Sequence, residues 1–221
     1  SDLGVSGVDQ DVAIVANTLN DYELGVDGSG DLTVTAFKSE NGVNFSHYSL
    51  YDVDVVRGIE TLQFSDGTIT VSQSSPGAAY TLTSAPTLSY GYRVLKTSSN
   101  DIQTVFGGAG HEYVYLNDDE GNTVTLDGIE RVYGSSGDDD LTFTSNDITQ
   151  VSGGGGADQV HLTSNEGNTT SINGVEIVDS GSGDDNITLT GATAATVDGG
   201  SGNDTIQSLG FNGIGYGSGD D

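Results

Sequence analysis

A glycine-rich loop recurs along the second half of this chain, and it restricts the fold more than any other feature. Most copies carry glycines near the first, second and fourth positions, an acid at the sixth, and an apolar residue two positions after the acid. The copies occupy residues 107–112, 134–139, 153–158, 180–185 and 199–204, and a sixth copy at 216–221 ends with the chain. Repetition of this kind predicts a solenoid, in which stacked repeats bury their apolar residues against one another.

The segments that follow the loops alternate as β-strands do. The apolar residue after each acid should point inward and stack, whereas its threonine neighbours should point outward. These apolar residues are Val114, Leu141, Val160, Ile187 and Ile206. We therefore predict an all-β fold, with a parallel β-roll or β-solenoid over residues 76–221 and a β-rich flanking region over residues 1–75.

The loops are not evenly spaced. Their starts at 107, 134, 153, 180 and 199 are separated by 27, 19, 27 and 19 residues, so the sequence repeats after 27 + 19 = 46 residues. Within this repeat Glu120-Gly121-Asn122 aligns with Glu166-Gly167-Asn168, and Glu130 aligns with Glu176. The spacing predicts one wide solenoid turn with a glycine loop on each side. Loops 107, 153 and 199 would stack in one column, and loops 134, 180 and 216 in the other.

The loops have the chemistry of a calcium site. Calcium takes six to eight oxygen ligands, and glycine lets the backbone turn its carbonyls toward one point. A single loop cannot surround the ion, so each ion is expected between stacked loops. The predicted carboxylate ligands are Glu112, Asp158 and Asp204 in one column and Asp139, Asp185 and Asp221 in the other. The predicted loop glycines are Gly108, Gly110, Gly137, Gly154, Gly156, Gly181, Gly183, Gly200 and Gly202.

Other interpretations of these residues stay open. Gly-Asp pairs also form ordinary turns, and for loop 107–112, whose acid is a glutamate, turn and ligand are equal alternatives. Asp138, Asp184 and Asp220, one position before the predicted ligands, are expected to be solvated or to support the ligands. His111 and His161 could suggest zinc, but they lie beside glycine loops rather than in a His/Cys cluster, which favours surface histidines.

The flanking region has no clear loop motif, and residues 4–9 hold at most a degenerate one. Two hairpins are predicted there. Tyr22–Val26 and residues 31–37 flank an Asp-Gly-Ser-Gly turn at 27–30, and residues 62–64 and 68–71 flank a Ser-Asp-Gly turn at 65–67. No helix is expected.

Composition limits the partners. The chain has 33 Asp and Glu against five Lys and Arg, a net charge of -28. Such a chain repels nucleic acid and anionic lipid, so the expected small partners are calcium ions. There is no Cys and hence no disulfide, and no apolar run is long enough to insert into a membrane. No signal peptide is visible, and we expect the sequence to be a piece of a longer protein.

These motifs resemble the RTX, or hemolysin-type calcium-binding repeat, family. The loops over 107–221 carry the resemblance, and the segment 58–68 is similar to a phrase that adjoins such repeats in large secreted bacterial proteins. The resemblance implies type I secretion, folding on calcium outside the cell, and a secreted, extracellular or cell-surface location. The 46-residue unit departs from the compact roll of that family.

We find no catalytic motif: the chain has no Cys nucleophile, no G-x-S-x-G and no H-E-x-x-H. The expected function is a non-enzymatic structural or adhesive module of a secreted, surface-layer or adhesin-like protein, with self-association or a cell-surface or matrix partner. One alternative is the non-catalytic repeat domain of a secreted protease, lipase or polysaccharide-modifying enzyme. Another is ice binding through the outward threonines Thr142, Thr144, Thr188 and Thr190, although β-propensity also explains threonine in strands.

Overall fold

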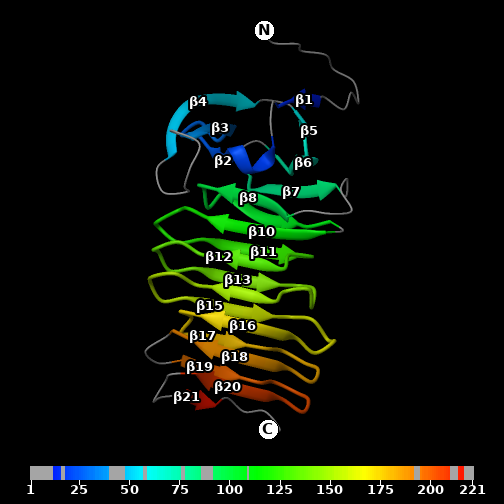
Figure 1. Cartoon of the computed structure of the whole chain (residues 1–221), viewed down its shortest axis with the longest axis vertical. Coiled ribbons are helices and arrows are strands. Elements are labelled where there is room, and N and C mark those ends of the chain that lie inside the picture. Colours follow the sequence, from blue (N-terminus) through cyan, green and yellow to red (C-terminus); the bar gives the residue numbers. More distant parts are fainter. Residues whose placement is uncertain are drawn as a thin grey trace.

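The chain folds into a parallel β-solenoid of about six turns, seen in a computed structural model. The structure describes residues 12–15, 18–39, 48–56, 59–75, 78–85, 92–108, 110–191, 195–209 and 214–216. Stacked coils descend from the N-terminal to the C-terminal end of an elongated molecule (Figure 1). The predicted all-β fold class is confirmed. Within the described ranges the only helix assigned is η1 (Leu19–Asp21), a short 3₁₀ turn, so no helix there could cross a membrane.

Two sheets form the walls of the solenoid, and the chain passes from one to the other at each step. Sheet A has eleven strands in the spatial order β1 (Val12–Ile14), β5 (Thr61–Phe64), β6 (Gly67–Gln73), β7 (Tyr80–Ala85), β9 (Ile102–Phe106), β11 (Thr123–Asp127), β13 (Asp140–Phe143), β15 (Gln159–Leu162), β17 (Ile177–Asp179), β19 (Ala195–Asp198) and β21 (Ile214–Tyr216). Sheet B has ten strands in the order β4 (Tyr48–Val56), β3 (Leu32–Ser39), β2 (Tyr22–Val26), β8 (Tyr92–Thr97), β10 (His111–Leu116), β12 (Arg131–Tyr133), β14 (Gln150–Ser152), β16 (Thr169–Asn173), β18 (Asn186–Thr190) and β20 (Thr205–Leu209).

One coil consists of two strands, one in each sheet. Parallel partners in successive coils are 17 residues apart at Thr123 and Asp140 and 21 apart at Val151 and Ile172. Inward positions are apolar and stack along the axis, as alternation predicts: Val114, Leu141, Val160 and Ile187 are fully buried. Ile206, in the last coil of sheet B, is partly buried.

The prediction of a wide, 46-residue solenoid turn is wrong. Residues 107–152 contain five strands, β10–β14, and residues 153–198 contain five more, β15–β19. Five strands make two and a half coils, so the second copy of the repeat begins on the opposite sheet from the first. Val114 therefore lies in sheet B, while its equivalent Val160 lies in sheet A. The 27-residue spacing holds one and a half coils, and the 19-residue spacing holds one.

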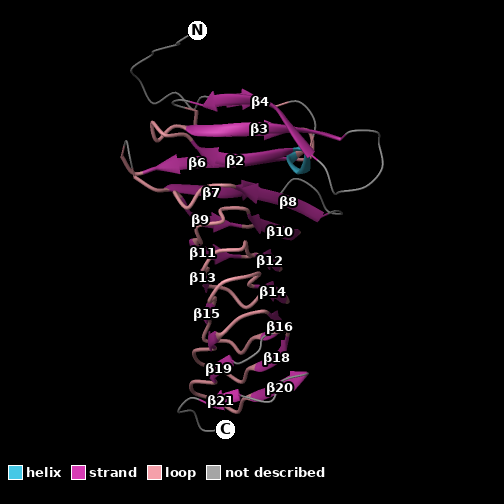
Figure 2. Cartoon of the chain, turned by 90° about the vertical axis from the view of Figure 1, so that its left-hand side faces the viewer, coloured by secondary structure: helices cyan, strands magenta, loops and turns pink. Residues whose placement is uncertain are grey.

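The two predicted hairpins are confirmed. Strands β2 and β3 pair antiparallel, as do β5 and β6, and β4 and β7 extend the two sheets by further antiparallel pairing. Both sheets then continue without a break into the solenoid, through the parallel pairs β2–β8 and β7–β9. The flanking hairpins form a broader end on the narrower solenoid column (Figure 2). Residues 4–9 lie outside the described residues.

Candidate metal centre

The glycine loops lie on the two edges of the solenoid, where the chain crosses between sheets. We call the turns from sheet B to sheet A the first edge; they include 117–122, 134–139, 153–158 and 174–176. The turns from sheet A to sheet B form the second edge; they include 107–110, 128–130, 144–149, 163–168, 180–185 and 199–204. Loops 134 and 153 are thus stacked neighbours, as are loops 180 and 199. The predicted columns are wrong, because loops 107 and 153, 153 and 199, and 134 and 180 are each two and a half coils apart and lie on opposite edges. Loops 107 and 199 share the second edge but are five coils apart.

A ladder of hydrogen bonds joins successive coils on the first edge. The backbone N–H of Asn122 donates to Oδ1 of Asp139 (2.8 Å), and its side-chain amide donates to the same oxygen (2.7 Å). The N–H of Asp139 donates to Oδ1 of Asp158 (2.9 Å), and the N–H of Asp158 donates to Oε2 of Glu176 (2.9 Å). Each carboxylate therefore holds the backbone of the preceding coil.

The second edge carries the same ladder, displaced by one repeat. The N–H and side-chain amide of Asn168 donate to Oδ1 of Asp185 at 2.6 and 2.8 Å. The N–H of Asp185 donates to Oδ1 of Asp204 at 3.0 Å. A separate rung joins the N–H of Glu112 to Oε2 of Glu130 at 2.6 Å.

Three of the ladder carboxylates have one oxygen without a hydrogen-bond donor among the described residues. Within the described part of the chain, no donor reaches the inaccessible Oδ2 atoms of Asp158, Asp185 and Asp204. Asp158 and Asp185 are almost completely buried. An unpaired buried carboxylate oxygen costs free energy, which a cation can remove. Asp139 differs, because its Oδ2 accepts the N–H of Ser135 at 2.9 Å.

A backbone carbonyl lies beside Oδ2 of Asp158, and another lies beside Oδ2 of Asp139. A Cβ added to Gly153 would overlap both Oδ2 of Asp158 and the carbonyl oxygen of Gly174. A Cβ added to Gly134 would overlap Oδ2 of Asp139 and the carbonyl oxygen of Gly153. Gly134 and Gly153 therefore each leave room for a carboxylate oxygen and a carbonyl oxygen side by side. Oxygen pairs of this kind are the ligands that calcium prefers.

Most of the predicted loop glycines are in conformations that disfavour other residues. Gly154 has φ of 108° and lies against the carbonyl of Ser135 in the preceding coil, so both its backbone and its surroundings exclude a side chain. Positive φ also occurs at Gly156, Gly181, Gly183, Gly200 and Gly202. Gly137 packs against the backbone of residues 119–121, and Gly108 and Gly110 lie in the turn between β9 and β10.

Burial makes the charged form of Asp158 costly. The pKa of the Asp158 carboxyl is raised to about 6, chiefly by desolvation and also by the nearby acids Asp139, Glu176 and Asp138, while the hydrogen bond from the Asp139 N–H opposes the rise. Desolvation also raises the pKa of Glu130 above its ordinary value. The protein alone therefore stabilises the anionic form of Asp158 and Glu130 poorly.

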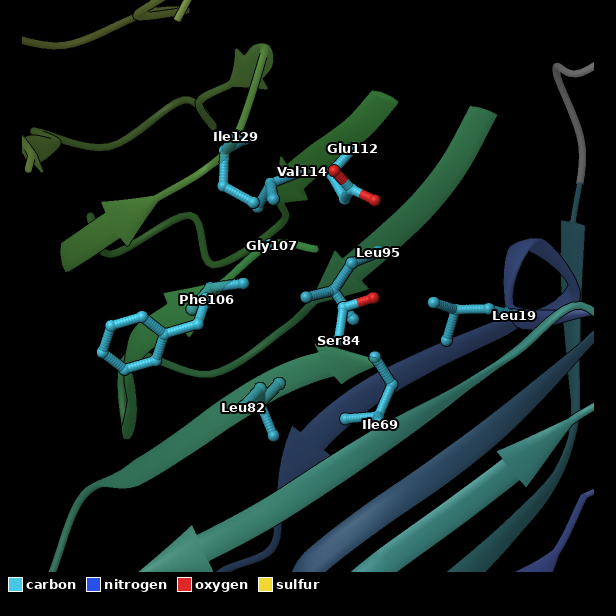
Figure 3. A pocket seen from close by; sticks show the side chains of 11 residues that line it. Leu19, Ile69, Leu82, Ser84, Leu95, Phe106, Gly107, Glu112, Val114 and Ile129 are labelled. Carbon is cyan, nitrogen blue, oxygen red and sulfur yellow. The ribbon is translucent and has the colours of Figure 1, made fainter. Parts of the chain in front are cut away.

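Glu112 stands apart from the other predicted ligands. It is buried in β10, and the next coil on its edge offers Glu130 rather than a second glycine loop. With Ser84 it supplies the polar side chains of an otherwise apolar pocket, where Leu19, Ile69 and Leu82 of the flanking region meet Val114 and Ile129 of the solenoid (Figure 3). This surrounding favours a role in the junction over a loop-type cation site.

The ladder includes residues that the sequence did not identify as site residues. Four such residues make hydrogen bonds of the ladder: Asn122, Asn168, Glu130 and Glu176. The only sequence signal was that Asn122 recurs as Asn168, and Glu130 as Glu176, in the second copy of the repeat. Asp138 and Asp184, expected to be solvated or supporting, each accept a backbone N–H from the next coil, from Ala157 (2.8 Å) and Asn203 (2.9 Å).

The remaining candidates do not join a cluster. Within the described ranges, no three His, Asp or Glu side chains converge as a ready-made cation site. A calcium site here would need backbone carbonyls beside the carboxylates. His161 lies on the outer face of sheet A, 3.6 Å from Asp140 and 3.8 Å from Asp179, and His111 is exposed at the start of β10. Asp221 lies outside the described residues.

Comparison of the chain with protein-family models, with curated proteins and with solved structures finds no match.

Proposed function

We propose that the chain is a calcium-dependent structural or adhesive module of a secreted or cell-surface protein, with loops of the RTX type. The observation that carries the proposal is the set of buried Oδ2 atoms of Asp158, Asp185 and Asp204, for which the described residues supply no donor. Each belongs to a glycine loop stacked on another glycine loop, and at Gly153 a carbonyl oxygen shares the space with the carboxylate.

Calcium suits these residues for reasons of charge and ligand type. The chain has a net charge of -28, and its coils bring carboxylates into successive layers. Like charges this close repel, and a divalent cation between layers would replace repulsion with attraction. An ion that binds only the folded state raises the free energy of unfolding by RT ln(1 + [L]/Kd) per site, which is about 2.7 kcal/mol when the free ion concentration is 100 times Kd. Calcium would therefore stiffen a rod of stacked coils.

The test is calorimetric titration of the whole chain with calcium, together with thermal unfolding in calcium, in magnesium and after chelation. We expect calcium to bind and to raise the melting temperature, and chelation to lower β-type circular dichroism. Asp158→Ala and Asp185→Ala should each weaken calcium binding at least tenfold at one site. Glu120→Gln is the matched control, since it removes one negative charge from an exposed turn residue. A melting temperature indifferent to calcium would refute the proposal.

The threonine array of the ice-binding alternative does not form as expected. Thr142 lies in β13 of sheet A, with Thr144 just after it, whereas Thr188 and Thr190 lie in β18 of sheet B. The half-coil offset of the repeat puts the two pairs on opposite sides of the solenoid. We therefore do not propose ice binding.

A further inference from the structure

Over the solenoid strands β10 to β20, the outer face of sheet B has no acidic residue, in contrast to the outer face of sheet A. The outward positions of β10, β12, β14, β16, β18 and β20 include no Asp or Glu, although the chain has 33. The outer face of sheet A, over the same coils, carries Asp127, Asp140, Asp179 and Asp198. The six sheet B strands follow one another down one side of the column (Figure 2). They span about 24 Å at the usual strand spacing.

Aromatic side chains occupy the N-terminal end of this face. Tyr115 of β10 and Tyr133 of β12 stack with ring centroids 4.5 Å apart and ring planes 12° apart. The guanidinium of Arg131 lies 5.0 Å from the centre of the Tyr113 ring. All four side chains are partly exposed. Burial raises the pKa of the Tyr115 hydroxyl, as expected for a ring that is covered by its neighbour.

The ring of Tyr133 has one face covered and one face toward the following coil. Tyr115 covers the first face, and the strand register places Ser152 beside Tyr133 on the other side. Because serine is small, a flat ligand could stack on this second face above Ser152. Two positions earlier on the same face, Arg131 pairs with Gln150 in the next coil. The side chains of both residues can donate hydrogen bonds to such a ligand.

The second copy of the repeat shows that the solenoid does not need these side chains. Positions 46 residues after Tyr115 and Tyr133 hold His161 and Asp179, on the equivalent outward sites of β15 and β17. The backbone register is the same, since Tyr115 pairs with Tyr133 as His161 pairs with Asp179. Folding of the coils therefore does not require aromatic residues at these positions, and the presence of Tyr115 and Tyr133 has to be explained in another way.

We propose that the outer face of sheet B binds a neutral polysaccharide, with a sugar ring stacked on Tyr133 above Ser152. Sugar rings present flat C–H faces that pack on aromatic rings, and their hydroxyls pair with hydroxyl, amide and guanidinium groups. A straight row of amide and hydroxyl residues extends from Ser152 through Asn173 to Thr190, which suits a linear polymer lying along the axis.

Charge selects a neutral polymer over an acidic one. The face itself is close to neutral, but the edges and the opposite sheet carry the acids that give the chain its charge of -28. The field of those acids repels a polyanion. A neutral polysaccharide would be the ligand of the proposed adhesive module. This proposal rests on the proposed function only in that calcium would keep the coils folded.

The test is affinity electrophoresis of the whole chain, in calcium, through gels that contain hydroxyethylcellulose, galactomannan, dextran, polygalacturonate or hyaluronate. The main variant combines Tyr115→His with Tyr133→Asp, the pair that the second copy already accommodates. Tyr133→Phe keeps the ring, and Ile177→Ser changes an exposed apolar residue on the opposite sheet. Circular dichroism and melting with and without calcium, on the same samples, separate loss of binding from loss of the calcium-dependent fold.

We expect at least one neutral polysaccharide to retard the chain, with binding at least tenfold weaker in the double variant. Tyr133→Phe and Ile177→Ser should bind within about twofold of the original chain. Three results would overturn the proposal: no retardation by any neutral polymer, retardation by the acidic polymers alone, or equal retardation of a folded double variant. None of these results depends on whether calcium is the bound ion.

Discussion

A hydrogen bond joins Asp139 and Asp158, which lie in adjacent coils: the backbone N–H of Asp139 donates to Oδ1 of Asp158 over 2.9 Å. The other oxygen, Oδ2, is buried beside Gly153, and no donor among the described residues reaches it. One oxygen of the carboxylate thus holds the coils together, while the other has no hydrogen-bond partner among the described residues. The effects of the hydrogen bond and of the negative charge can be separated by mutation.

Asp158→Asn should have opposite effects with and without calcium. The amide oxygen can still accept the N–H of Asp139, but the buried negative charge is gone. Without calcium we expect the variant to be more stable than the original chain at pH 7, by up to about 3 kcal/mol, since each pKa unit is worth about 1.4 kcal/mol. With calcium it should be less stable, because a ligand charge is lost. Chemical denaturation in both conditions measures this, and a variant less stable in both would contradict it.

The pH dependence of the calcium-free chain follows from the same carboxyl. The folded-state pKa of Asp158 is about 6, above the ordinary value of 3.8, so between these values the folded state binds more protons than the unfolded state. Stability should therefore fall as pH rises from about 4 to about 7, and be highest below this range as far as Asp158 is concerned. Urea denaturation at several pH values tests this. Asp158→Asn should flatten the slope, and an unchanged slope would show that other groups dominate.

Glycine at the first position of the loop should be required, whereas glycine at the third should not. Gly153→Ala puts a Cβ against Oδ2 of Asp158 and the Gly174 carbonyl, so we expect a loss of more than about 2 kcal/mol and impaired calcium binding. Gly155→Ala is the matched control. Its Cβ would find no atom nearer than 3.7 Å, and its φ is not in the positive region. We expect a change within about 0.5 kcal/mol there. Equal losses of stability in both variants would contradict a specific role for Gly153 in leaving room for the two oxygens.

Much of this architecture follows from local patterns. The hairpin β2–β3 was predictable because Asp27-Gly28 lies between two alternating segments, and the inward position of Leu141 was predictable from the motif. The number of coils per repeat was not. Strand β12 has three residues, Arg131–Tyr133, too few for alternation to reveal it, so the 27-residue spacing was taken for one half of a 46-residue turn.

The candidate site was predictable only where the glycine motif marks it. Asp158 and Asp185 were identified by their position in the loop, and both are buried. Glu176 was not, because its turn at 174–176 lacks the motif, although its carboxylate accepts the N–H of Asp158. Which loops stack on one another depends on the count of strands between them, and spacing alone does not supply that count.

The flanking hairpins should keep their structure when calcium is removed, while the glycine-loop coils lose theirs. Strands β5, β6 and β7 pair antiparallel and bury Leu62, Ile69 and Leu82, and the described turn between β5 and β6 contains no stacked glycine loop. Hydrogen exchange after chelation should therefore leave residues 61–73 protected and expose the amides of 134–209. The coils between them, from β8 to β12, share an apolar junction with the flanking region and should show intermediate protection. Uniform loss across the chain would instead mean that the continuous sheets make the molecule a single cooperative unit, with calcium holding both parts.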